Sequence, residues 1–304
     1  MKGYTNKVFR TFTGLFVTIG LIVPSTLIAQ NSGPSLGVDK KEAAVSDTLD
    51  GWNLNLMAGL NGSQNSFNNW SQGGVNSISG TAMTWFEAHY RNDRFGYLFN
   101  TNLKYGKARL EGKETRKTSD QLSVKNKFTY DFQDSRFSLY GNVDFSSQFD
   151  EGIDYSDSTE PVISRFMAPG FFRQSVGLSY EPLEFLTFET GIGFKQTYMR
   201  DTDLSTRYGL DPGEKFRFEA GGVFNVTAEK QIMKNIKYRS SFESFANFQQ
   251  SFKYTDFEFS NQVVGSINEY INTTFEFVIV YDRDYSSELQ IKQMLSAGLQ
   301  LNIL

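Results

Sequence analysis

The chain has one histidine, His89, and its position limits the acid–base chemistry that the sequence can support. Polar and apolar residues alternate around it, so His89 shares the polar face of an extended segment with Glu87. A histidine can activate a serine nucleophile when an orienting carboxylate or amide lies nearby. An enzyme that cleaves membrane lipid needs this group at the lipid surface, whereas the alternation turns His89 toward the interior. We therefore predict no catalytic residue and a lumen-lining or interfacial His89.

Charged residues of both signs occupy polar positions of the alternating segments. A selective ion pathway often has a ring of one sign, but these signs are interleaved. Two interpretations stay open: cross-strand ion pairs that solvate and stiffen an interior, or a narrow polar pathway for a zwitterionic or uncharged solute. The charges predicted to line the interior are Lys125, Lys127, Asp144, Arg173, Glu189, Arg217, Glu219, Arg239, Glu243 and Glu276.

Three loop segments have compositions that bear on ligands. The acidic stretch Asp150–Asp157 offers oxygen ligands for calcium but lacks the positional pattern and terminal Glu of an EF-hand loop, so we predict a solvated loop without metal. The apolar stretch Ile163–Gly170 contains Met167 and Pro169, and we expect it to fold into a mouth or dock a partner.

The third segment contains Asn69, Trp70, Gly73 and Gly74. Trp70 could stack on a sugar, and the glycine pair permits tight backbone turns. The alternative is a structural loop folded inward beneath a mouth. Neither interpretation requires a cofactor, and we predict none.

The strands that position these residues are predicted from apolar residues at every second position. From Phe216 to Ala228, apolar residues take every second place with mostly polar residues between them, which is typical of a β-strand with one apolar face. About twelve such segments run from Trp52 to Ile303, and no amphipathic helix interrupts them.

The connections alternate between short turns and long loops, as they do between the periplasmic and extracellular ends of outer-membrane barrels. In hydrocarbon every backbone polar group must be paired, and only closure removes the two sheet edges. We therefore predict an all-β fold, an antiparallel up-and-down transmembrane β-barrel of about 12 strands. The long loops are expected at Asn61–Val75, Lys107–Ser119, Asp150–Gly170, Arg200–Lys215, Gln249–Asp256 and Asp282–Gln290.

The chain is predicted to be exported. Residues 1–29 read as a signal peptide, with basic residues before a short apolar run that contains Pro24. Residues 30–51 are predicted to be a periplasmic lead-in and residues 52–304 the barrel, with both termini periplasmic. Cysteine is absent, which excludes disulfides and thiolate metal sites, and the net charge of -4 gives no sign of a nucleic-acid partner.

The segment Ser66–Ser77, SFNNWSQGGVNS, resembles the NW-x-x-GG-x-N-S signature of a Bacteroidetes-type family, domain of unknown function 3078. The resemblance implies an outer-membrane barrel of unsettled role and brings no catalytic residues. Further matching pieces follow in the expected order at Tyr105–Gly106, Arg116–Asp120, Gln148–Gly152, Ile163–Gly170, Lys234–Ile236 and Tyr281–Asp282.

The sequence thus favours an outer-membrane barrel of a Gram-negative bacterium without enzymatic activity, either a porin-like channel for small solutes or the membrane subunit of an envelope assembly. The expected partners are outer-membrane lipid and either a small polar solute or an envelope protein. The alternatives are a barrel hydrolase acting on lipid or lipopolysaccharide, and a secreted all-β binding module.

Overall fold

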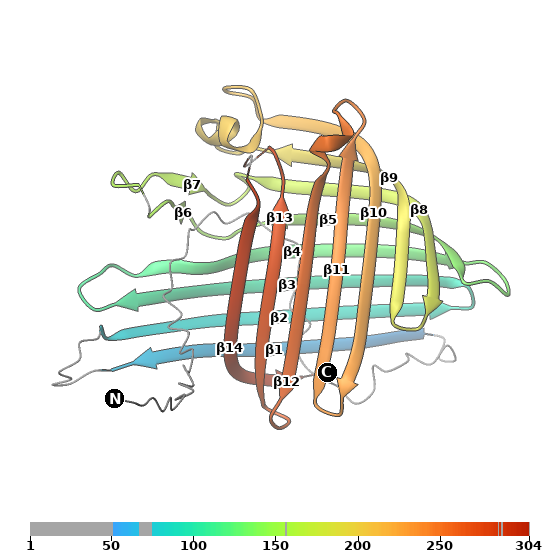
Figure 1. Ribbon diagram of the computed structural model, residues 1–304, viewed down its shortest axis with the longest axis horizontal. Helices are drawn as coiled ribbons and strands as arrows, with labels where there is room; N and C mark the ends of the chain where they lie inside the picture. The colour runs from blue at the N-terminus through green and yellow to red at the C-terminus, as the bar shows by residue number, and fades with distance from the viewer. Residues whose placement is uncertain (1–50, 67–74, 156, 285, 287, 304) are drawn as a thin grey trace, which may run out of the picture.

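Twelve long strands, each hydrogen-bonded to its neighbours along the chain, close into one antiparallel barrel (Figure 1). The computed structural model describes residues 51–66, 75–155, 157–284, 286 and 288–303. The predicted all-β barrel of about 12 strands is confirmed. The wall consists of β1 (Gly51–Asn65), β2 (Ser77–Asn92), β3 (Phe95–Leu110), β4 (Arg116–Asp131), β5 (Phe137–Ser147), β8 (Gly170–Leu183), β9 (Leu186–Tyr198), β10 (Phe216–Met233), β11 (Ile236–Asn247), β12 (Asp256–Ser266), β13 (Ile271–Tyr281) and β14 (Gln290–Asn302).

The ring is closed by pairing between β1 and β14. Five residue pairs join these strands, from Met57 opposite Asn302 to Asn61 opposite Gly298. Fifteen pairs join β1 to β2. The side chain of Asn61 also donates from Nδ2 to Ser296 Oγ at 3.3 Å across the closure. The sheet therefore has no free edge running its full length, as hydrocarbon requires.

Alternating side chains give each strand an apolar outer face. On β10, Phe216, Phe218 and Phe224 are exposed by 54%, 52% and 44%, whereas Glu219 between them is 5% exposed. Aromatic side chains of neighbouring strands stack along this face, with ring centroids 4.5 Å apart for Phe137 and Tyr180. Such a continuous exposed apolar surface is unfavourable in water and suits the hydrocarbon core of a membrane.

No helix in the described ranges is both long enough and apolar enough to cross a membrane.

The two ends of the barrel differ in their connections. Tight turns follow β2, β4, β8, β10 and β12, while the other end carries a hairpin of β6 (Gly152–Ile153) and β7 (Val162–Ser164) and two short 3-10 helices. These are η1 (Thr202–Tyr208), between β9 and β10, and η2 (Phe252–Tyr254), between β11 and β12. The predicted sorting of short turns and long loops to opposite ends therefore agrees with the strand order.

Two predicted loops are shorter than expected. Within Lys107–Ser119, β3 continues to Leu110 and β4 already begins at Arg116. Residues 61–65 of the predicted Asn61–Val75 loop likewise belong to β1. The apolar alternation stops where the lipid face stops, but backbone pairing needs no apolar side chain. The strands therefore extend beyond the apolar band as polar hairpins.

A close backbone approach between β8 and β9 requires glycine. Gly177 lies directly opposite Gly191, and a Cβ on Gly177 would lie 2.0 Å from Thr190 O. We expect Gly177→Ala to destabilise the barrel by about 1–3 kcal/mol, because the strands must move apart. Urea unfolding of barrel refolded in detergent measures this cost. Gly141→Ala is the matched control, since its Cβ would be 3.9 Å from the nearest atom; an equal loss in both variants would contradict the assignment.

Candidate functional site

The barrel encloses a polar cavity of about 400 Å³ whose lining comes from β2 through β13. Inward-facing positions recur every second residue, which is why charges separated along the chain meet here. Glu276 on β13 and Glu219 on β10 are buried but are not part of this lining, and Glu219 forms an ion pair with Arg217. The predicted lumen charges that line the cavity itself are Lys125, Lys127, Asp144, Arg173, Glu189, Arg239 and Glu243.

The charged side chains that follow one another from β4 to β9 on the inner wall form a row that is mainly cationic. Strand pairing places Lys125 on β4 opposite Asp144 on β5, and Asp144 opposite Arg173 on β8. Lys127, two residues further along β4, forms an ion pair with Glu189 on β9. Each carboxylate of this row therefore has a cation beside it.

A second row is anionic. Asn225 on β10 lies between Glu189 and Glu243, and Glu243 lies opposite Glu258 on β12. In the ring order β12 and β4 are six strands apart. The anionic row of Glu243 and Glu258 thus faces the β4 row that contains Lys125 across the cavity. The charges are more segregated than the interleaved pattern predicted from the sequence.

The remaining predicted lumen charges lie in local ion pairs. Arg217 Nη2 donates to Glu219 Oε1 and to Asp284 Oδ1, each at 2.8 Å. Lys292 Nζ donates to Glu276 Oε1 at 3.0 Å.

Sequence reasoning missed four inward carboxylates. Glu258 lies between Phe257 and Phe259, so the period of two could have placed it on the inner face. The others, Asp256, Asp282 and Asp284, follow or begin strands, where the alternation ends and gives no signal. All three accept from Lys195 Nζ on β9, at 3.1, 2.9 and 3.3 Å.

His89 lies on the inner face of β2 and its Nε2 pairs with Glu87 Oε1. Glu87 also lines the cavity and accepts from Asn100 Nδ2 at 3.4 Å. The imidazole is therefore turned toward the lumen, away from the lipid surface where a lipid hydrolase would need it.

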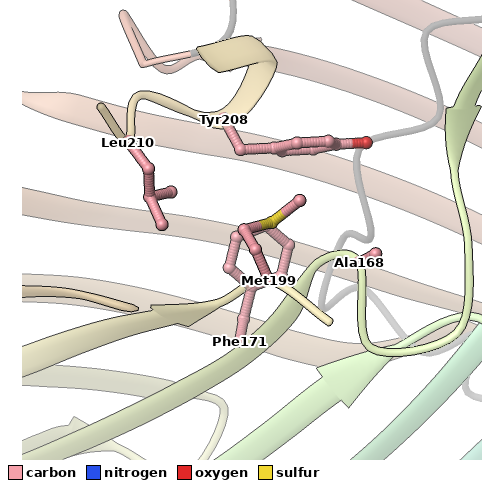
Figure 2. Packing of buried hydrophobic residues seen from close by; sticks show 5 residues of the cluster. All are labelled: Ala168, Phe171, Met199, Tyr208 and Leu210. Atoms are coloured by element: carbon pink, nitrogen blue, oxygen red, sulfur yellow. The ribbon is translucent and has the colours of Figure 1, made fainter. Parts of the chain in front are cut away.

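Part of the apolar loop Ile163–Gly170 is covered by a neighbouring loop. Figure 2 shows Ala168, Phe171, Met199, Tyr208 and Leu210 gathered into a small apolar cluster between β8, the end of β9 and η1. Tyr208 donates from its hydroxyl to Ile163 O at 3.0 Å, and burial raises the pKa of Tyr208 to about 12. Ile163 and Ala168 of the apolar stretch are thus buried against the β9–β10 loop of the same chain, whereas Phe166 remains 42% exposed.

Met167 and Pro169 lie in the turn at the end of this stretch, just before β8. Met167 has a φ of 56°, and the Ala168–Pro169 peptide bond is cis. Ser147 Oγ accepts from Met167 N at 2.9 Å and donates to Pro169 O at 3.0 Å. The backbone of both residues is therefore held by the Ser147 side chain at the end of β5.

Hydrogen bonds to the buried Asp120 carboxylate hold the start of the acidic loop in place. Asp120 is buried and accepts from Phe149 N, Asp150 N and Lys117 Nζ, each at 2.8 Å. The Tyr105 hydroxyl donates to Asp150 at 2.6 Å, and this hydrogen bond, with that from Glu151 N, lowers the pKa of Asp150. The Asp150 carboxylate is thereby engaged in contacts within the chain.

The other loop motif, Asn69, Trp70, Gly73 and Gly74, lies outside the described residues.

Solved structures similar to this chain are outer-membrane barrels. The translocator domain of autotransporter NalP from Neisseria meningitidis is 10% identical, with 82% of this chain and 86% of that chain covered and a TM-score of 0.40. The COG4313 outer membrane channel from Pseudomonas putida F1 is 9% identical, with 87% and 98% covered and a TM-score of 0.42. These values are too low for a shared function to follow from them.

No curated protein matches the chain in sequence. A likeness to a family model is found in the region from the end of β1 to β6. Residues 63–153 match the family described as "Protein of unknown function (DUF3078)", which confirms the predicted family resemblance over these residues.

Proposed function

We propose that the protein is a non-enzymatic pore for small zwitterionic or uncharged polar solutes in the outer membrane of a Gram-negative bacterium. The observation that carries this proposal is the cavity with its cationic and anionic rows on opposite walls. A solute with both charges can orient between such rows, whereas an ion of one sign meets repulsion from one wall.

The orientation in the membrane is part of the proposal. Residues 1–29 act as the export signal, the periplasmic lead-in ends before β1 begins at Gly51, and both termini face the periplasm. The sorting of short turns to one end and loops with β6, β7, η1 and η2 to the other supports this orientation.

Planar bilayers and liposome swelling test the pore. We expect stepwise conductance from the purified barrel and faster swelling in glycine than in equal concentrations of sodium glutamate or lysine hydrochloride. A barrel that is folded, as shown by heat-dependent gel mobility, but has neither conductance nor swelling activity would contradict the proposal.

The ion preference should depend on the cavity charges. We expect Lys125→Gln combined with Arg173→Gln to shift the permeability ratio toward cations by roughly twofold or more. Removing two positive charges from the cavity wall raises the local concentration of cations. Glu243→Gln should shift it toward anions. The zero-current potential in a KCl gradient measures both changes. Lys113→Gln, in the β3–β4 turn, is the control; an equal shift there would place selectivity outside the cavity.

A second candidate is the membrane subunit of an envelope assembly. It is favoured by an open groove of about 650 Å³ among the long loops, lined by Arg165, Phe149 and Phe166. The two phenylalanines are 46% and 42% exposed and lie beyond the wall strands. A silent barrel that co-purifies with one envelope protein, and loses it on Phe166→Asp, would support this candidate over the pore.

A further inference from the structure

Asn102 is an inward-facing residue of β3 with an unused hydrogen-bond donor. The residue lines the polar cavity and is 2% exposed. Its Nδ2 is buried and has no hydrogen-bond partner within the described part of the chain. Strand pairing places Asn102 between Trp85 on β2 and Ser123 on β4, which line the same cavity. A buried donor without an acceptor is unfavourable, so this amide is a candidate contact for a bound solute.

Trp85 supplies an apolar surface beside this amide. Met57 on β1 and Met83 on β2 are 4% and 5% exposed, and they form a small cluster against which Trp85 packs. Trp85 itself is only partly buried and belongs to the cavity lining. An indole that is packed on one side and open to the cavity on another offers a flat apolar surface for a ring or a bulky alkyl group.

The neighbouring row of the same wall carries both signs of charge. Two residues along each strand, Glu87 lies opposite Asn100, and Asn100 lies opposite Lys125. Glu87 Oε2 accepts from Asn100 Nδ2 at 3.4 Å, a long hydrogen bond that an ammonium can replace. Lys125 forms neither a hydrogen bond nor an ion pair with any residue that the structure describes. Adjacent strands are about 5 Å apart, so Glu87 and Lys125 are about 10 Å apart at the backbone, and their long side chains shorten the gap.

We propose that the solute bound in the pore is a zwitterion with an aromatic or bulky apolar side group, of which an aromatic α-amino acid is the simplest case. Its carboxylate accepts from Asn102 and Lys125, and its ammonium donates to Glu87. Its side group lies on Trp85. The cavity of about 400 Å³ is in the size range of small-molecule sites. This inference rests on the proposed pore and adds the chemistry of the solute.

A structural role for Asn102 predicts a different response to substitution. Asn102→Leu keeps the size of the side chain and removes the amide. If the amide is unpartnered in the empty barrel, its loss should leave the stability of the barrel unchanged or higher, because no hydrogen bond is lost. If the amide holds the wall together, the same variant should unfold at lower urea concentration. Stability and solute affinity therefore respond in opposite ways under the proposal and together under a structural role.

Equilibrium dialysis of the full barrel in detergent, with radiolabelled L-phenylalanine or glycine, measures binding without conductance. We expect saturable binding of L-phenylalanine that is on the order of tenfold or more tighter than that of glycine, through burial of the side group. Phenethylamine, which lacks the carboxylate, should not compete. Asn102→Leu should weaken L-phenylalanine binding by roughly tenfold or more, since it removes a hydrogen bond to a charged group. Trp85→Leu should weaken it by about three- to tenfold, through the lost ring contact.

Trp52→Leu is the matched control, because Trp52 is 61% exposed on the outer face of β1. Its affinity for L-phenylalanine should equal that of the wild type, and heat-dependent gel mobility confirms that each variant is folded. Equal affinities for phenylalanine and glycine, or unchanged binding in both Asn102→Leu and Trp85→Leu, would overturn this inference and leave the pore intact. Selective phenylalanine binding by a barrel that does not conduct would instead contradict the pore and keep the binding site.

Discussion

Replacing Phe224 with arginine is expected to impair insertion of the barrel by roughly 2–4 kcal/mol, the cost of a cation at the bilayer midplane. Phe224 is on the outer face near the middle of β10 and is 44% exposed. A guanidinium there has no partner in hydrocarbon and must distort the bilayer to reach water. The measurement is reversible folding into lipid vesicles across a guanidinium chloride series.

The neighbouring substitution provides the control. Asn225 points to the lumen and lies between Glu189 and Glu243 on the adjacent strands. Asn225→Arg should therefore be tolerated, because the new cation meets two carboxylates in a polar cavity. Equal losses in the two variants would mean that the assigned faces of β10 are wrong.

Asp120→Ala is expected to release the loop between β5 and β8. The substitution leaves Phe149 N, Asp150 N and the Lys117 ammonium without their shared acceptor. Removing one member of a buried, hydrogen-bonded charge pair costs about 3–5 kcal/mol. Limited proteolysis should then cut within residues 150–169 at low protease concentration, and the melting temperature should fall.

The same measurements on Asp157→Ala should change little. Asp157 is exposed, and its carboxylate Oδ1 accepts from the backbone N and the hydroxyl of Thr159, two residues away. If proteolysis of the two variants were the same, the contacts of Asp120 would not be what holds this loop.

The barrel could be predicted from sequence because hydrocarbon imposes one simple rule on each strand. Apolar side chains such as Phe216 and Phe218 must alternate with inward polar ones such as Glu219, and that period is visible without any knowledge of neighbours. The polar ends of β3 and β4, which extend beyond the apolar band, could not be predicted from this alternation. Their pairing depends on backbone hydrogen bonds, which leave no period in residue type.

The lumen was predicted in content but less well in arrangement. Alternation within a strand assigns a charge to the inner or outer face. Which charges meet across strands depends on the pairing register, and the sequence of one strand does not reveal that register. The opposition of Glu243 to Glu258 could not be predicted for this reason, and Glu258 itself was overlooked although the period of two places it on the inner face. The acidic cluster around Lys195 was also missed, since it is built from strand ends and loops that converge only after the ring closes.

The short contact between β1 and β14 has a mechanical consequence. With five residue pairs against fifteen on the other side of β1, it is held by far fewer backbone hydrogen bonds than the β1–β2 junction. Under heat or pulling force the cylinder should rupture along this line and unroll from its two terminal strands. The interior hairpins would then remain intact as a curved sheet, and re-annealing would require only that the same two strands find each other again.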